Sequence, residues 1–175
     1  MRFAKLTILT AFAVLVLTGL GLLATYTPLA ALALGEANET PVKIQINSQA
    51  IDLPIQKGEY LRATGQWQIS ESSAFFAAAS TAPNSYSGNT LIYAHNRPSL
   101  FAKTINLVIG DEISLSTISG KIFRYQVTGA QDVDPRDTTI LNYKGEPQLT
   151  LLTCSGPGDS TRRLTYAKLI AKIDK

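Results

Sequence analysis

The sequence predicts a mainly β (all-β) domain, built as a barrel or a sandwich, behind an apolar N-terminal segment. Three observations support this fold class. Many short segments alternate apolar and polar residues or are almost wholly apolar, turn-forming residues separate them, and only one stretch looks like a short helix. With 175 residues, 45% of them hydrophobic, the chain is long enough for one domain with a real core and a short additional segment.

The N-terminal segment is the first element. No charged residue occurs in the 29 residues from Leu6 to Leu34, and Arg2 and Lys5 precede this run. A helix that spans a membrane needs about 20 apolar residues, and basic residues flanking it stay on the cytoplasmic side. We therefore expect a single-pass protein of the cell membrane whose remaining residues lie on the extracellular face.

The predicted boundaries follow from the change in composition. Residues 1–27 are predicted to be a cytoplasmic stub and signal anchor, with the transmembrane helix at 6–27, followed by a linker at 28–40 and a globular domain at 41–175. A cleaved signal peptide is the alternative, because Ala31-Leu32-Ala33 resembles a small-residue cleavage site. Both alternatives place the globular domain outside the cell.

The strands of the globular domain are predicted by period-two alternation or by short apolar runs between turn signals. The predicted strands are 42–46, 50–55, 90–95, 112–117, 121–128, 148–154 and 164–173. A short helix is expected from Pro98 to about Asn106, with Ser99 as its cap. The apolar stretch Ala74–Ala79 has no assigned element, and core packing is favoured over a place beside a substrate.

Charge gives no reason to expect nucleic-acid binding. The formal net charge is +3, and without Arg2 and Lys5 the chain has 14 basic and 13 acidic residues. A balanced surface of this kind lacks the basic excess that a phosphate backbone attracts.

Cys154 is the only cysteine and His95 the only histidine of the chain. A single cysteine in an extracytoplasmic domain leaves either a free thiol or an intermolecular bridge. A buried and inert cysteine is the common alternative to a reactive one. One cysteine and one histidine supply too few ligands for zinc, so neither a metal site nor a cofactor is expected.

His95 ends one predicted strand, Cys154 ends another, and Arg162 begins a third after the loop Ser155–Thr161. Strand ends that open into loops are common places for active sites. These residue types suit acyl transfer: a thiolate is a nucleophile, an imidazole can move a proton, and a guanidinium can hold a substrate carbonyl or an oxyanion. Because side chains alternate along a strand, only one of Arg162 and Arg163 should point toward Cys154.

Several segments resemble the signatures of the sortase family, in the family's order. Thr150-Leu151-Leu152-Thr153-Cys154 resembles the TLxTC motif, Arg162–Ala167 resembles the downstream arginine segment, and Asn89–His95 resembles the strand that carries the family histidine. Further similar segments are Pro98–Phe101, Ile109–Ile113 and Asp134–Leu141. The resemblance covers the whole globular part, and it departs from many sortases in having Ala94 before the histidine.

The resemblance implies a closed eight-stranded β-barrel with one or two short helices, and a cysteine transpeptidase. Such an enzyme cleaves an LPxTG-like sorting signal through a thioacyl intermediate and transfers the acyl group to an amine of a peptidoglycan precursor or of a pilin lysine. By position, Cys154 would be the nucleophile, His95 the general acid and base, and Arg162 the stabiliser of the substrate or oxyanion. No cofactor is expected. The segment between Asp111 and Gly129 contains no cluster of carboxylates, so no calcium site is expected either.

The main alternative is a membrane-tethered β-barrel without catalytic activity that binds a wall or surface ligand. An L,D-transpeptidase is disfavoured because its compact glycine-rich signature is absent from the sequence. A papain-like protease is disfavoured because its cysteine precedes its histidine in the chain, whereas Cys154 follows His95.

Overall fold

The structure is a computed structural model that describes residues 39–61 and 66–174. The predicted anchor at 6–27 and all but the last two residues of the predicted linker lie outside these ranges. Among the described residues, no helix is both long and apolar enough to cross a membrane.

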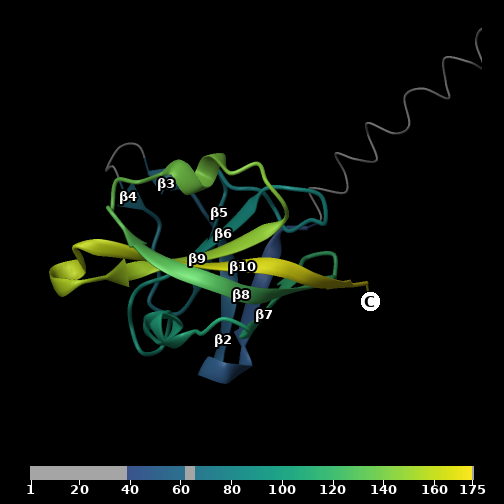
Figure 1. Cartoon of the computed structure of the whole chain (residues 1–175), viewed down its shortest axis with the longest axis horizontal. Coiled ribbons are helices and arrows are strands. Elements are labelled where there is room, and N and C mark those ends of the chain that lie inside the picture. Colours follow the sequence, from purple (N-terminus) through teal and green to yellow (C-terminus); the bar gives the residue numbers. More distant parts are fainter. Residues whose placement is uncertain (1–38, 62–65, 175) are drawn as a thin grey trace, which may run out of the picture. The chain divides into compact units, whose positions relative to one another are not determined.

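Eight strands form one closed barrel in the order β1-β2-β5-β6-β9-β10-β8-β7, and β3 and β4 form a separate two-stranded sheet (Figure 1). The strands are β1 Pro41–Ile46, β2 Ile51–Gly58, β3 Tyr60–Leu61, β4 Gln66–Trp67, β5 Ala74–Ala77, β6 Asn89–Tyr93, β7 Glu112–Thr117, β8 Ile122–Val133, β9 Gln148–Ser155 and β10 Thr161–Ile173. The pairs β2–β5 and β6–β9 are parallel, and the other barrel pairs are antiparallel. The closed eight-stranded barrel implied by the resemblance is therefore confirmed.

Alternation along the strands builds the barrel core, because every second side chain points inward. On β8, Phe123, Tyr125 and Val127 are almost completely buried, and the intervening residues are partly exposed. On β9, Leu149 and Leu151 join the same core. Closing the sheet into a barrel leaves none of these eight strands with an unpaired edge.

Helical structure is more fragmented than the expected one or two short helices. The described residues contain four 3-10 helices of three to five residues: η1 Asn47–Gln49, η2 Ala102–Asn106, η3 Thr139–Asn142 and η4 Pro157–Asp159. The helix predicted from Pro98 starts four residues later, and Ser99 does not cap it. The reason is that Leu100 and Phe101 are buried in the core, with their N–H groups bonded to the carbonyls of Arg97 and His95.

The unassigned stretch Ala74–Ala79 contains β5, and its two faces pack differently. Ala74 and Phe76 point into the barrel core, whereas Phe75 and Ala77 belong to a second apolar cluster. The second cluster also contains Leu91 and Tyr93, and Trp67, Ile140, Leu141 and Leu152 pack against it. Because side chains alternate on a strand, this cluster lies on the outer face of β5, β6 and β9.

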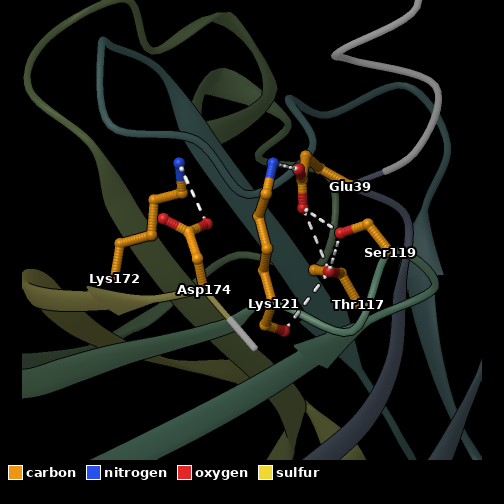
Figure 2. A network of polar contacts seen from close by, with 6 residues as sticks. All are labelled: Glu39, Thr117, Ser119, Lys121, Lys172 and Asp174. Atoms are coloured by element: carbon orange, nitrogen blue, oxygen red, sulfur yellow. Dashed lines mark hydrogen bonds and ion pairs between the residues drawn. The ribbon is translucent and has the colours of Figure 1, made fainter.

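Glu39 is fixed to the hairpin between β7 and β8, although it falls in the predicted linker. Its side chain is 6% exposed, and its Oε2 accepts hydrogen bonds from Thr117 Oγ1 and Ser119 Oγ, both at 3.0 Å. Its Oε1 pairs with the ammonium group of Lys121 (Figure 2). The packed part of the chain therefore already includes Glu39.

Candidate active site

Three strands that are neighbours in the barrel carry the three predicted site residues or lead directly to them. The order is β6, β9, β10, with Cys154 on the central strand. In Figure 1, β9 and β10 run side by side, and the loop that joins them lies at the end of the pair opposite the C-terminus. Cys154 lies one residue before the end of β9, and Arg162 is the second residue of β10.

Arg162 is the direct antiparallel partner of Cys154. Cross-strand partners have Cβ atoms about 4.5–5.5 Å apart and project from the same face of the sheet. Arg163 instead pairs with Thr153 on one side and with Asp132 on the other. The register therefore gives Arg162, and not Arg163, the position beside the thiol.

His95 follows β6, which runs parallel to β9 with Tyr93 opposite Leu152. The contact continues past the strand end, because Ala94 N donates to Leu152 O at 3.2 Å and Thr153 Oγ1 donates to Ala94 O at 2.9 Å. Continued by two residues, this register places His95 beside Cys154. The turn after His95 is held through its carbonyl, which accepts from the N–H groups of Arg97 and Phe101 at 2.9 and 3.1 Å.

The electrostatics at Cys154 combine opposing effects. Burial raises the pKa of the thiol above its usual value, the positive charge of Arg162 lowers it, and the negative charge of Asp159 raises it further. The thiol is free and only partly exposed. Burial is the largest of the three effects, so the pKa of the thiol lies above its usual value.

The Arg162 guanidinium is held against the loop that follows Cys154. Its Nη1 donates to the carbonyls of Asp159 and Thr161, both at 2.9 Å. An arginine has five N–H donors, so other donors remain for a substrate oxygen. The loop contains η4, with positive backbone φ at Gly156, Gly158 and Asp159.

Four polar residues near this site were not singled out from the sequence: Asp132, Ser155, Asp159 and Thr161. Asp132 was missed because the strand was predicted to end at Thr128, whereas β8 continues to Val133. It continues because β10, with 13 residues against 12 in β8, pairs with it as far as Arg162. The polar-apolar alternation stops at Gly129, so only the length of the pairing strand could have indicated the extension.

The chain is similar in sequence to known proteins. Residues 44–170 match the family model described as "Sortase domain". The chain is 27% identical over 130 residues to "Sortase A" of Bacillus anthracis, a match that covers 71% of this chain and 57% of that protein. It is 25% identical over 76 residues to "Sortase A" of Listeria monocytogenes serovar 1/2a, covering 43% of this chain and 34% of that protein. The matches thus span about half or less of these relatives' lengths.

Solved structures show the same fold. The crystal structure of Streptococcus agalactiae sortase C1 in complex with MTSET has a TM-score of 0.64 at 24% identity, covering 76% of this chain and 68% of that one. Sortase A from Corynebacterium diphtheriae has a TM-score of 0.62 at 23% identity, and the match covers 78% of this chain and 63% of that one. Because the family model matches well over half of the residues, the chain belongs to the sortase family.

Proposed function

We propose that this chain is a sortase-type cysteine transpeptidase that cleaves an LPxTG-like sorting signal and transfers the acyl part to an amine. The observation that carries the proposal is the register of three neighbouring strands. Cys154 and Arg162 are cross-strand partners on β9 and β10, and β6 leads into His95 on the other side of β9. This order supports a site in which the three groups that acyl transfer to a thiol requires lie close together.

In the first step, the Cys154 thiolate attacks the threonine carbonyl carbon of the sorting signal, and the C–S bond forms as the carbonyl oxygen takes up negative charge. Arg162 donates to that oxygen. The C–N bond to glycine then breaks, and His95 gives a proton to the departing amine. Burial raises the pKa of the Cys154 thiol, and the positive charge of Arg162 opposes this rise and so favours the thiolate.

In the second step, an amine attacks the thioester carbonyl, loses a proton to His95, and displaces the Cys154 thiolate as a new amide bond forms. An amine of a peptidoglycan precursor would attach the surface protein to the cell wall, and a pilin lysine would extend a pilus. No water is consumed when an amine resolves the thioester, so transfer and hydrolysis are distinguished by the product.

The partly exposed residues that pack against the second apolar cluster offer an apolar surface for the substrate beside the thiol. Leu152 packs against this cluster and is two residues before Cys154 on the same face of β9. Phe75 and Tyr93 stack with ring centroids 5.5 Å apart, and Trp67 packs edge-on to Tyr93 at 5.4 Å. We propose that the apolar leucine and proline of a sorting signal bind along this side.

The proposed location is the extracellular face of the cell membrane, with residues 6–27 as a single-pass anchor. The uncharged run behind Arg2 and Lys5 supports this location. Accessibility of Cys154 to an impermeant thiol reagent on intact cells tests it, because a cytoplasmic domain would stay unlabelled until the cells are lysed.

The activity is tested with the full chain in detergent, an LPxTG-type peptide, and either diglycine or a lysine peptide as acceptor. Mass spectrometry should detect a thioacyl adduct on Cys154 and amine-capped product, and Cys154→Ala should give neither. The preferred acceptor separates wall attachment from pilin polymerisation. A folded protein that forms no adduct with a panel of sorting signals, and whose thiol resists alkylation, would contradict the proposal and favour the ligand-binding barrel.

A further inference from the structure

Four polar residues form one connected network behind the row of predicted catalytic residues. Ser155 Oγ donates to Asp132 Oδ1 at 2.9 Å, and Arg163 Nη2 pairs with Asp132 Oδ2 at 2.9 Å. Ser155 Oγ and Thr161 Oγ1 share a further hydrogen bond at 2.9 Å. Asp132 is the centre of the network, since each of its carboxylate oxygens accepts a different partner.

The network lies on the opposite face of the strands from the Cys154–Arg162 pair. Ser155 follows Cys154 directly, and Thr161 and Arg163 flank Arg162 in the sequence. Because neighbouring side chains on a strand point to opposite faces, the network side chains point away from the thiol. The network therefore contacts no reacting group, but it holds the backbone on both sides of the pair.

Asp132 also connects strands that are not neighbours. β8 pairs with β10, and β10 pairs with β9, so Ser155 belongs to the second strand from Asp132. Asp132 thus bonds to a residue of β9 and to a residue of β10, at the point where both strands enter the loop. One carboxylate fixes the positions of three strand ends relative to one another.

The loop itself cannot provide this support by apolar packing. All five residues between Ser155 and Thr161 are exposed, and none belongs to a core cluster. The Arg163 Nε is buried and has no hydrogen-bond partner among the described residues, so the pair with Asp132 is what orients this guanidinium. Polar contacts at the base of the loop therefore add to the backbone pairing that joins the two strand ends.

We propose that Asp132 is a positioning residue, which keeps Cys154 and Arg162 in the register that acyl transfer needs. This inference rests on the proposed transpeptidase function. Shifts of about 1 Å in a catalytic group can lower turnover by about 100-fold. The role of Asp132 is therefore to preserve the distance between nucleophile and oxyanion donor through Ser155 and Arg163.

The test compares Asp132→Ala and Asp132→Asn with Asp52→Ala as a matched control in the full chain. Asp52 on β2 forms an ion pair with Lys43 on β1, away from the site, and the distance between the charged groups is the same 2.9 Å. We expect Asp132→Ala to lower kcat by about 10- to 100-fold, with KM changed by less than about 3-fold, and Asp52→Ala to leave both unchanged. Ser155→Ala and Arg163→Ala should each cause part of this loss and add little to Asp132→Ala, since they act through the same carboxylate.

Two further readouts separate positioning from a general loss of structure. The pH profile of Cys154 alkylation should move to higher pH in Asp132→Ala, as in Arg162→Ala, because a displaced Arg162 charge lowers the thiol pKa less. Hydrogen exchange at the amides of residues 155–163 should become at least about 10-fold faster, while amides of β1 and β2 keep their rates.

Equal kcat in Asp132→Ala and Asp52→Ala would overturn the inference. Unchanged exchange at residues 155–163 would overturn it as well, even if no peptide is turned over. Failure of the wild-type chain to transfer any sorting signal would instead contradict the proposed function, while hydrogen exchange still decides whether Asp132 holds the strand ends. Asp132→Asn covers the case in which the alanine variant does not fold.

Discussion

Cys154 and Arg162 are cross-strand partners beside the loop that joins β9 to β10, and the next pair away from the loop joins Thr153 to Arg163. This single step in register gives two adjacent arginines different roles. Arg162 acts on the thiol and bonds the loop carbonyls, whereas Arg163 pairs with Asp132 on the opposite face. The alternation expected from the sequence is what separates them.

The first prediction concerns the two arginines. Arg162→Ala should lower kcat/KM by about 100- to 1,000-fold, the loss typical of removing one oxyanion donor. Arg163→Ala should lower it by only about 10-fold, because Arg163 acts on the strand ends and not on the substrate. Steady-state kinetics of peptide transfer measures both values.

Arg162→Lys is the informative companion variant. Lysine keeps the positive charge and loses the planar fork of donors, so it should restore little of the activity if the geometry of the donors matters. Equal losses from Arg162→Ala and Arg163→Ala would contradict the assignment of Arg162.

The second prediction concerns the pH dependence of Cys154 alkylation. Burial raises the pKa of this thiol, so the alkylation rate should still be rising above the usual pH range of a free thiol. Arg162→Ala removes a charge that lowers the pKa and should move the profile to higher pH. Asp159→Asn removes a charge that raises the pKa and should move the profile to lower pH.

Rates with iodoacetamide between about pH 6 and pH 10 give the three profiles. The opposite directions of the two shifts are the decisive feature, because a general loosening of the site would move both profiles the same way. A common direction would show that the charges of Arg162 and Asp159 do not act on the thiol as the structure indicates.

The third prediction concerns the close approach of Gly58 to Tyr93 and Phe75 of the second apolar cluster. A Cβ at position 58 would lie 2.2 Å from Tyr93 Oη and 3.0 Å from Phe75 Cβ. Gly58→Ala should therefore destabilise the fold by about 1–3 kcal/mol, the usual cost of overpacking. Urea unfolding of the variant and the wild type measures the difference.

Two variants control this result. Gly129→Ala, on β8, places a Cβ where no heavy atom lies within 4 Å, and should cost little. Tyr93→Phe removes the contacting hydroxyl, which is buried and has no hydrogen-bond partner among the described residues. Gly58→Ala should then cost less in the Tyr93→Phe background, and an unchanged cost would show that the clash lies elsewhere.

Local patterns identified the strands of the barrel, but not the contacts between them. Alternation and short apolar runs between turn signals predicted seven of the eight barrel strands, because both patterns depend only on which side chains are buried. The hydrophobic stretch that forms β5 has little polar contrast, since both of its faces are buried, and it received no assignment. The row formed by His95, Cys154 and Arg162 required the strand order, which alternation does not contain.

Asp132 illustrates the same limit for the site. Its role depends on a contact with a residue 23 positions later, on a strand that is not its neighbour. A single sequence contains no local signal for such a contact. The pairing of Arg162 with Cys154, by comparison, was predictable because Arg162 lies only eight positions after Cys154, across one short loop.

The last prediction concerns Glu39 and Lys121. Glu39 raises the pKa of Lys121 through their hydrogen bond, so the pair stabilises the fold fully below the usual lysine pKa and loses this contribution as the pH rises through the raised value. Glu39→Gln should lower Tm by roughly 5 °C at pH 7, and the difference from wild type should narrow above about pH 11. Glu112→Gln, which breaks the exposed pair with Arg124 on the same hairpin, should change Tm little at either pH. A Glu39→Gln deficit that stays constant with pH would mean that the hydrogen bonds from Thr117 and Ser119, and not the charge of Lys121, hold this residue.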